Sequence, residues 1–478
     1  MKRGSVTIYL ALVFMVLLAM LTMLLTAARD SVIRMKTECS MDAALYSVFA
    51  EYNRELLNQY DLLFIDTSYG GGQGKIANPA EHLRYYMNQN LKPDTGLVFG
   101  DTKDLLALTA ADVTITDYAL ATDDKGMVLE RQAIDYIRNL YGMNSLQKIQ
   151  GYLESAEAHN LLTRDVSAEQ SANQAQIDSM ELPKKQISEE EWEEVPLDNP
   201  ADAVNGARGI GILSFVLDDD QQLSTQSVAL TNYVSHRNCA KGSGVGTRDK
   251  VTIPDRLLFD RYIMEKTDCY TSETPEGLLH YQLEYILAGK SGDSQNLEAV
   301  AQKLLFIRQA ANITYLFSDA GKVAEAEALA LSLTAVSMAP EFAEPVKLSI
   351  LLAWAYAESV YDVKHLLSGG KIPLMKTAAT WHFSLSQMLQ FSQYLSEEAD
   401  GNLEEGLSYE EYLGMLLLTE KHEDKLNRMM DLIEMDIRNT DGNHQFRLDT
   451  CVDYLEAQVV VESGYGYGCE ITRSYYYY

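Results

Sequence analysis

The sequence predicts an α+β fold that is mostly α-helical, and three patterns lead to this class. No charged residue occurs from Ser5 through Ala28, so an apolar helix of membrane-spanning length opens the chain. From Gly277 to about Arg438 apolar residues recur at helical spacing, which predicts a C-terminal helical bundle. Near the end, the period switches to alternation, which predicts a terminal β-hairpin and a small mixed sheet for it to join.

The composition is that of a folded and strongly acidic protein. In 478 residues there are 39 Lys and Arg against 69 Asp and Glu, a net charge of −30, while the apolar share of 47% is ordinary for globular domains. A nucleic-acid footprint needs clustered basic residues, so we expect no nucleic-acid partner. Five cysteines exclude a disulfide-dense small scaffold and a multi-cluster iron–sulfur protein.

Residues 1–28 are predicted to form a leader and a transmembrane anchor. The run from Val6 to Ala28 would reach about 34 Å as a helix, enough to cross a hydrocarbon core of about 30 Å. A signal-peptide core is shorter, about 7–15 apolar residues, although Thr26-Ala27-Ala28 also fits a small-residue cleavage site. The other alternative is a buried helix of a soluble protein, but such helices rarely stay uncharged for so long. Membrane lipid is therefore an expected partner.

The orientation in the membrane depends on more than charge. Lys2 and Arg3 precede the span, and Arg29, Arg34 and Lys36 follow it, so the basic residues do not decide the topology. The short leader and the long domain behind it favour translocation of that domain. The uncharged stretch 348–357 is too short to span and is predicted to be a core helix. We expect a single-pass cell-membrane protein with a large extracytoplasmic domain.

The anchor helix is predicted to continue beyond the membrane as an amphipathic helix. Neither glycine nor proline occurs between Ser5 and Tyr69. Apolar residues repeat there at helical spacing at Met41, Leu45, Val48, Phe49, Tyr52 and Leu56. One helix over 5–58 would place an apolar half in the membrane and pack the other half on the domain.

The rest of the chain divides into five predicted segments. They are a helical stalk with a small α/β region over 29–166, an acidic linker or long loop over 167–206, an irregular β-containing region over 207–276, the helical bundle over 277–445 and the terminal strand or hairpin over 446–478. Within the first segment we expect strands over 61–66 and 112–121 and helices over 129–140 and 145–162. The early strands near Leu63 and Ile115 are the candidates to pair with the terminal strand. The glutamates around Trp192 indicate a solvated linker, with a partner-binding peptide as the alternative.

Three glycine-containing loops resemble ligand-binding motifs but lack their defining residues. Residues 70–75 lack the first glycine and the Ser or Thr of a phosphate loop, and residues 242–246 lack the dinucleotide-binding spacing. Residues 439–442 resemble the middle of a calcium loop, but Ile437 and Leu448 stand where carboxylates are required. We therefore predict turns at all three places, and we predict no catalytic residue, no cofactor and no metal.

Glu358, Asp362 and His365 form the most interesting cluster, because their spacing puts them on one helix face. Metal sites in helical bundles use such faces, but they need matching carboxylate and Glu-x-x-His motifs on other helices, of which we find no second copy. A solvated or capping polar face near Gly369-Gly370 is the favoured interpretation, and metal binding is the alternative. His382 has no Cys or His at ligand spacing and is interpreted as a packed histidine.

The cysteines allow disulfides if the domain lies outside the cell. Cys239 could then pair with Cys269, and Cys451 with Cys469. Four cysteines allow three connectivities and the spacing is not diagnostic, so unpaired buried thiols are favoured. Cys39 would be left over beside the membrane, either free or bridging two subunits.

Several short pieces carry a resemblance that spans nearly the whole chain. They are Gly4-Ser5-Val6-Thr7, Ser47-Val48-Phe49-Ala50-Glu51-Tyr52-Asn53, Leu62-Leu63-Phe64-Ile65-Asp66, Glu284-Tyr285-Ile286-Leu287 and Trp354-Ala355-Tyr356-Ala357-Glu358-Ser359. In them the chain resembles uncharacterised single-pass membrane proteins of clostridial-type bacteria with tight-adherence pilus genes. None of these pieces is a catalytic motif.

The first residues, Met1-Lys2-Arg3-Gly4-Ser5, also look like a short pre-pseudopilin leader. This resemblance implies cleavage between Gly4 and Ser5 and the helix geometry of a pilin-like subunit. The chain departs from the pattern at Tyr9, since typical prepilins carry glutamate five residues after the cut.

These observations predict a membrane-tethered, non-enzymatic component of a tight-adherence pilus or a related secretion apparatus. Other pilus or secretion-system proteins would be its partners, and the N-terminal helix could also join copies of the chain into a homo-oligomer. The alternative is a tethered extracytoplasmic binding module or hydrolase without a role in pili.

Overall fold

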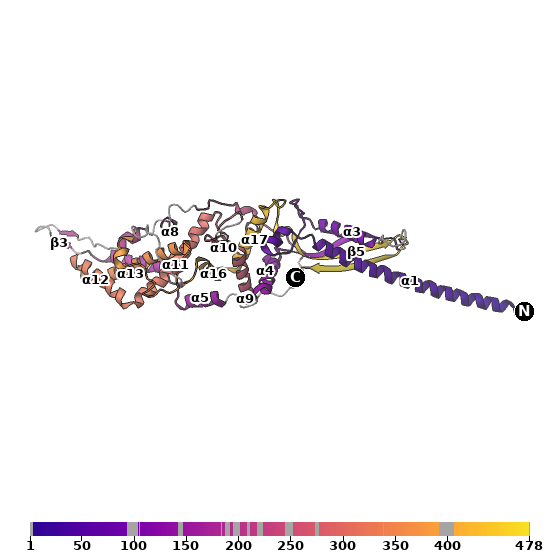
Figure 1. The fold of residues 1–478 in the computed structure, drawn as a ribbon, viewed down its shortest axis with the longest axis horizontal. Helices are drawn as coiled ribbons and strands as arrows, with labels where there is room; N and C mark the ends of the chain where they lie inside the picture. The colour runs from indigo at the N-terminus through magenta and orange to yellow at the C-terminus, as the bar shows by residue number, and fades with distance from the viewer. Residues whose placement is uncertain are drawn as a thin grey trace. The chain divides into compact units, whose positions relative to one another are not determined.

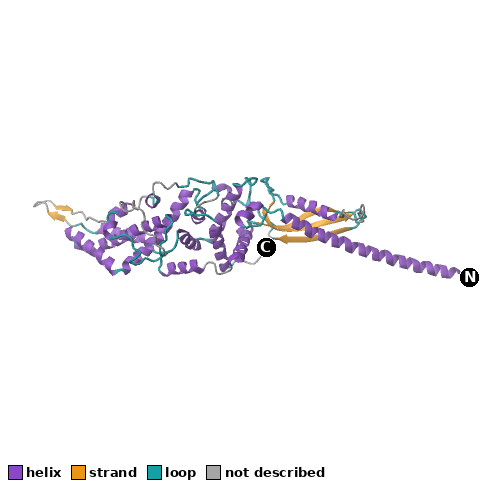
Figure 2. Ribbon diagram, in the orientation of Figure 1, coloured by secondary structure: helices purple, strands orange, loops and turns teal. Residues whose placement is uncertain are grey.

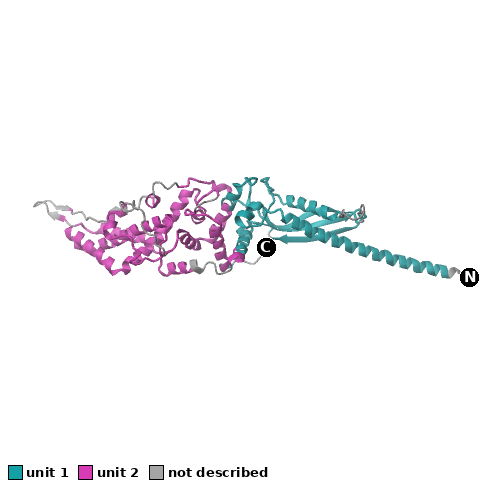
Figure 3. Ribbon diagram, viewed as in Figure 1, with its two compact units in different colours: residues 1–136, 233–252, 433–478 teal, residues 137–232, 253–432 magenta. Residues whose placement is uncertain are grey.

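In the computed structural model the chain forms two compact units (Figure 1 and Figure 3). Unit 1 comprises residues 1–136, 233–252 and 433–478, and unit 2 comprises residues 137–232 and 253–432. The structure describes residues 3–477 except for 93–103, 105, 142–146, 183, 187–191, 195–200, 208–210, 218–222, 244–251, 273–276, 338 and 392–405. The units are not consecutive segments, because the C-terminal strands return to the unit that contains the N-terminus.

Unit 1 combines helices with an antiparallel sheet. Its elements are α1 (Arg3–Phe49), α2 (Arg54–Tyr60), β1 (Ile65–Asp66), α3 (Ala77–Leu91), β2 (Leu108–Leu120), η2 (Val234–His236), η4 (Leu448–Thr450), β5 (Cys451–Ser463) and β6 (Gly468–Tyr476). Two helices have residues in both units, α4 (Asp123–Tyr141) and α17 (His422–Arg438). The predicted α+β, mostly helical class is confirmed (Figure 2).

Helix α1 ends earlier than the predicted helix 5–58. It stops at Phe49, and α2 starts four residues after Ala50, so the prediction of one unbroken helix is wrong. Asn53 causes the break: its side-chain oxygen accepts hydrogen bonds from the backbone N–H groups of Glu55 and Leu56, as a helix N-cap does. Its own N–H donates to the carbonyl of Phe64 instead of continuing the α1 ladder. An asparagine that offers the backbone another partner ends a helix without glycine or proline.

Strand β5 is the centre of the sheet and pairs with all three other strands. Strand β2 lies along one edge with Val113 opposite Val459, and β6 pairs with β5 with Ile471 opposite Val459. Strand β1 pairs at the start of β5, with Ile65 opposite Val452. The prediction that the terminal strand joins the early strands is confirmed, but every pairing is antiparallel, so the expectation of a mixed sheet is wrong.

The second half of α1 packs on this sheet and forms the core of unit 1. Met41, Leu45 and Val48 are buried in one apolar cluster with Leu455 and Val459 of β5. Helix α3 packs against α1 and β2. Burying such side chains contributes about 1.5–3 kcal/mol each, so this face holds α1 on the sheet.

Unit 2 contains the predicted helical bundle. Its elements are α5 (Gln147–Ala158), α6 (Val166–Ser179), β3 (Lys184–Gln186), β4 (Trp192–Glu194), α7 (Ala201–Ala207), α8 (Leu213–Val216), η1 (Leu230–Asn232), α9 (Ile253–Lys266), α10 (Gln282–Ala288), α11 (Asp293–Ser318), α12 (Ala320–Val336), η3 (Pro340–Phe342), α13 (Ala343–Leu367), α14 (Leu385–Met388) and α16 (Tyr409–Thr419). Helix α13 packs against α6, α7, α8, α11 and α12. It is buried all round from Ser349 to Leu367, so the uncharged stretch 348–357 is a core helix, as predicted.

The predicted linker 167–206 is partly regular structure. Helix α6 starts behind Asp165, whose side chain accepts a hydrogen bond from the N–H of Ala168. The Asn173 side chain donates to Ser349 Oγ at 2.8 Å and to the Pro345 carbonyl at 3.0 Å, so α6 is fixed to α13. Further on, β3 and β4 pair as a short hairpin that includes Trp192. The loop prediction is therefore wrong for 167–179, because a polar helix held by buried hydrogen bonds has a linker-like composition.

Candidate functional site

The first half of α1 is an uncovered apolar helix. None of the residues in the most apolar part of the helix is buried. Large side chains such as Leu10 and Phe14 are about two-thirds exposed. This is the one helix among the described residues that is long and apolar enough to cross a membrane. Gly4 and Ser5, the predicted cleavage site, lie in its first turn. The segment from Val6 to Ala28 therefore has the length and surface of the predicted anchor.

The C-terminal hairpin holds the packed half of α1. Phe49 contacts the rings of Tyr475 and Tyr477 at centroid distances of 4.6 and 4.9 Å. Arg473 of β6 forms ion pairs with Glu38 at 3.6 Å and Asp42 at 3.5 Å on α1. The hairpin thus fixes the direction in which α1 leaves the sheet.

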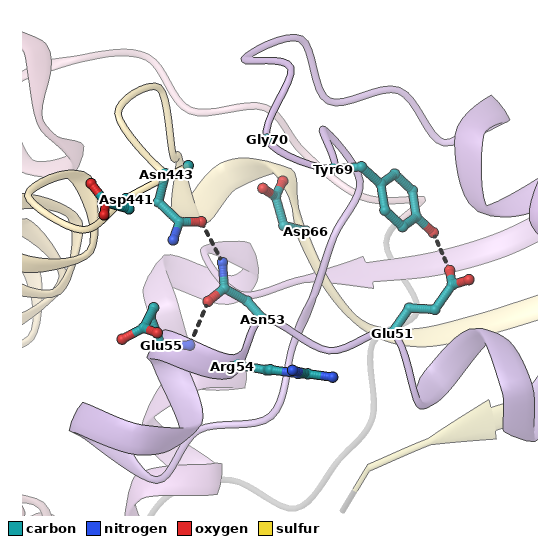
Figure 4. A pocket seen from close by; sticks show the side chains of 10 residues that line it. Glu51, Asn53, Arg54, Glu55, Asp66, Tyr69, Gly70, Asp441 and Asn443 are labelled. Carbon is teal, nitrogen blue, oxygen red and sulfur yellow. Dashed lines mark hydrogen bonds between the residues drawn. The ribbon is translucent and has the colours of Figure 1, made fainter.

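A polar surface cavity of about 290 Å³ lies in unit 1, where α1, α2 and two loops meet (Figure 4). It is lined by Glu51, Asn53, Arg54, Glu55, Asp66, Tyr69, Gly70, Asp441, Gly442 and Asn443. The two loops contain the predicted turns 70–75 and 439–442. The fold brings them together so closely that a Cβ on Gly70 would lie 3.0 Å from the carbonyl oxygen of Gly442. Asn53 Nδ2 also donates to Asn443 Oδ1 at 3.0 Å.

Glu51 organises one wall of this cavity. It accepts hydrogen bonds from the hydroxyls of Tyr69 at 2.9 Å and Tyr86 at 2.7 Å, and its Oε2 lies 2.8 Å from His82 Nδ1. Burial and the bond to Glu51 raise the pKa of Tyr69, and the bond to Glu51 raises the pKa of Tyr86. Both phenols therefore stay protonated at neutral pH and donate hydrogen bonds to the Glu51 carboxylate.

The cavity offers mainly hydrogen-bond acceptors. Asp66 is oriented by Ser68, whose N–H and hydroxyl each donate to one of its oxygens. Glu55 and Asp441 add carboxylates, and Arg54 adds one cation. Such a lining suits a small ligand rich in hydroxyl or ammonium groups.

The cluster Glu358, Asp362 and His365 lies inside unit 2 rather than on a solvated face. Glu358 and Asp362 are fully buried and share one ammonium: Lys376 Nζ lies 2.5 Å from Glu358 Oε1 and 2.7 Å from Asp362 Oδ1. Arg308, also fully buried, donates to Asp362 Oδ2 at 2.9 Å. Among the described residues, no group of three His, Cys, Asp or Glu side chains is placed to hold a metal ion. The prediction of a solvated face is wrong, and the cluster is a buried ion network.

The electrostatics of this network follow from its partners. Burial opposes the charged form of Asp362, but Lys376 and Arg308 outweigh it and lower the pKa of this carboxyl. Burial raises the pKa of Glu358 in spite of Lys376, and burial lowers the pKa of His365. His382 stacks on Tyr361 at a centroid distance of 3.8 Å but is otherwise exposed, so it is packed on one ring face and is not a core histidine.

Sequence reasoning missed the cations of the buried networks. Arg308 is buried on α11 together with the apolar Leu304 and Ala311, and a lone cation at the helical spacing of such residues is a sequence signal of a buried ion pair. Lys376 lies in a loop and gives no comparable signal. In unit 1, Arg237 binds Glu434 through two 2.6 Å hydrogen bonds and Asp449 through a third.

The cysteines are free thiols in the structure. Cys451 opens β5 opposite Asp66, whereas Cys469 pairs with Val461, ten residues further along the same strand. That separation is about 33 Å at strand rise, and a disulfide spans at most about 7 Å between Cα atoms. The strand register therefore excludes a bond between Cys451 and Cys469. Cys239 and Cys269 lie in different units, and their pairing stays a prediction.

The loop 242–246 is described only at its first two residues. Gly242 N–H donates to Asp123, and Ser243 exchanges hydrogen bonds with the backbone of Tyr118. These contacts tie the loop to the end of β2, so its described part is structural.

One family model matches the chain, over residues 190–463, and its description is a family of unknown function (DUF5702). No curated protein and no solved structure matches the chain. The matched range ends with β5 and excludes α1, β1 and β2, so it covers most of unit 2 and only part of unit 1.

Proposed function

The chain belongs to the DUF5702 family of unknown function, and we propose that it is a membrane-anchored, non-enzymatic and pseudopilin-like component of a tight-adherence pilus or a related secretion apparatus. The observation that carries this proposal is the division of α1. Its apolar first half is uncovered, while its second half packs on an antiparallel sheet. A pilin-like subunit divides its N-terminal helix in the same way.

The proposed mechanism is assembly through α1. In a bilayer the backbone N–H and C=O groups of the exposed first half would need no outside partner, because an α-helix pairs them with one another. Its side chains would then pack against other apolar helices, either those of further copies or those of a platform protein. The hairpin contacts at Phe49 and Arg473 hold α1 on the sheet, so the placement of α1 in the assembly would also place the sheet of unit 1.

The proposed orientation places unit 2 and the part of unit 1 that follows the span outside the cytoplasm. Basic residues flank both ends of the span and do not decide the topology, and the long domain that follows the span favours its translocation. Processing would cut between Gly4 and Ser5 and leave α1 almost intact, because the cut falls in its first turn.

The first test is the intact mass of the chain extracted from the membranes of its native host. We expect an N-terminus at Ser5. A chain that keeps Met1 would contradict prepilin-type processing and leave a static anchor.

The second test is site-specific photo-cross-linking in the native host. A photoreactive residue at Phe14, on the exposed half of α1, should form adducts with another copy or with a membrane protein of the apparatus. The matched control is Leu331, which is half exposed on α12 of unit 2. Adducts of Phe14 with lipid alone would overturn the assembly role.

A tethered binding module is the second candidate, and the polar cavity of unit 1 favours it. Its test is a ligand screen by thermal shift with hydroxyl-rich and ammonium compounds. Asp441→Asn, in the cavity lining, should abolish the thermal shift caused by a ligand bound there. A shift that persists in this variant would place binding elsewhere.

A further inference from the structure

The turn between β5 and β6 places two tyrosines beside the end of the apolar run. The turn is well defined: Ser463 N–H donates to the Tyr467 carbonyl at 2.7 Å, and Gly466 N–H donates to the Ser463 carbonyl at 3.0 Å. Gly466 has a φ of +84°, which glycine adopts without strain. Tyr465 is 58% exposed at the tip, although it is a large aromatic residue.

Both rings of this turn contact Arg29. The Arg29 guanidinium carbon lies 4.7 Å from the ring centroid of Tyr465 and 4.5 Å from that of Tyr467, which is cation–π distance. Arg29 is the first charged residue after the apolar run that ends at Ala28. The turn is therefore held at the level along α1 where the apolar surface stops.

We propose that this tyrosine turn, residues 463–468, is a second membrane contact that lies in the phospholipid headgroup region. The inference rests on the proposed anchoring of α1 and adds a lipid-binding surface on the sheet. If residues 6–28 fill the hydrocarbon core, Arg29 lies at its edge, and rings stacked on Arg29 lie at the same depth. Tyrosine is enriched at that depth because its ring is apolar and its hydroxyl is polar.

The chemistry of the turn fits a phospholipid surface. A guanidinium donates in a planar fork that matches phosphate oxygens, and its face can stack on aromatic rings at the same time. Arg473 on β6 also contacts α1, through ion pairs with Glu38 and Asp42, so the hairpin and α1 meet at more than one point. Contact at two points would fix the tilt of α1 and hold the sheet of unit 1 against the membrane surface.

The test uses the full chain in phosphatidylcholine vesicles with and without bromine atoms on the upper acyl chain, which quench nearby tryptophan. Three variants each add one tryptophan: Phe14→Trp in the span, Tyr465→Trp in the turn, and Tyr476→Trp at the opposite end of β6. Tyr476 is 54% exposed and serves as the matched control. The parent chain supplies the baseline for its three native tryptophans.

We expect the added fluorescence to be lost in brominated vesicles for Phe14→Trp and Tyr465→Trp and to be kept for Tyr476→Trp. If the fluorescence of Phe14→Trp is quenched but that of Tyr465→Trp is kept, as for Tyr476→Trp, the membrane contact of the tyrosine turn is overturned. The membrane anchor is then still supported. Absence of quenching at Phe14→Trp would overturn the anchor and, with it, the inference.

Discussion

Lys376 Nζ and Glu358 Oε1 lie 2.5 Å apart, and neither side chain is exposed to solvent. The same ammonium reaches Asp362, one helical turn further along α13, and donates to the carbonyl of Thr380 at 2.9 Å. Glu358 in turn accepts hydrogen bonds from the backbone N–H groups of His382 and Phe383. The loop after α13 is thus fastened to the helix by buried charge.

Lys376→Met should lower the free energy of unfolding by about 3–5 kcal/mol, because it leaves two buried carboxylates with too little positive charge. Urea unfolding in mild detergent measures the effect. Lys371→Met, at an exposed position of the same loop, is the control and should stay within about 0.5 kcal/mol of the parent. Equal stability of the two variants would contradict the assigned role of Lys376.

Glu284 gives the stability of unit 2 a pH dependence. It is fully buried and accepts hydrogen bonds from Tyr409 Oη and from the N–H of Tyr270, and burial raises its pKa from 4.5 to about 7. The folded state therefore holds this proton more tightly than the unfolded state does. Protonated Glu284 therefore contributes fully to the free energy of unfolding below pH 4.5. This contribution falls as the pH rises toward 7 and is lost above the folded-state pKa.

The free energy of unfolding that Glu284 loses over this pH range is about 3 kcal/mol, since each unit of pKa difference corresponds to about 1.4 kcal/mol. Glu284→Gln keeps the shape without the titration, so the difference from the parent in the free energy of unfolding should favour the variant increasingly between pH 5 and 7. Urea unfolding at a series of pH values measures this difference. The control is Glu410→Gln on the surface of α16, for which we expect no such trend. A pH-independent difference for Glu284→Gln would show that the carboxyl is not the titrating group.

The sequence predicted the features that arise from patterns along the chain. The apolar run to Ala28, the alternation around Val459 and the helical spacing around Leu304 each correspond to observed elements. What it missed depends on residues far apart in the chain. The cavity is lined by two loops that are distant in the sequence, one with Gly70 and one with Gly442. Glu358 pairs with Lys376, and the sequence spacing of the two residues does not predict that contact. Helix α6 was missed because its hold on α13, through Asn173, is a buried hydrogen bond rather than an apolar stripe.

Thiol reactivity should follow burial. Cys39 is exposed on α1, whereas burial raises the pKa of the Cys451 thiol well above its ordinary value. Alkylation of the folded chain with iodoacetamide, followed by peptide mass mapping, should modify Cys39 first and Cys451 last. Cys39→Ser should remove the fast phase. A fast phase that survives this variant would contradict the order of exposure, and a peptide linking Cys451 to Cys469 would contradict the register of β5 and β6.

Asn53 decides where α1 ends, and its replacement tests that role. Asn53→Ala removes the cap of α2 and the bond to Asn443, so we expect a loss of about 1–2 kcal/mol in the free energy of unfolding. Asn53→Ser keeps an oxygen that can cap α2 but loses the bond to Asn443, and it should recover about half of the loss. Hydrogen exchange at residues 50–57 distinguishes the causes, because an uncapped α2 exchanges faster at its first N–H groups. Slower exchange in Asn53→Ala would show that α1 and α2 have fused into the single helix that the apolar pattern alone predicts, and the cap would then be the sole reason for the break.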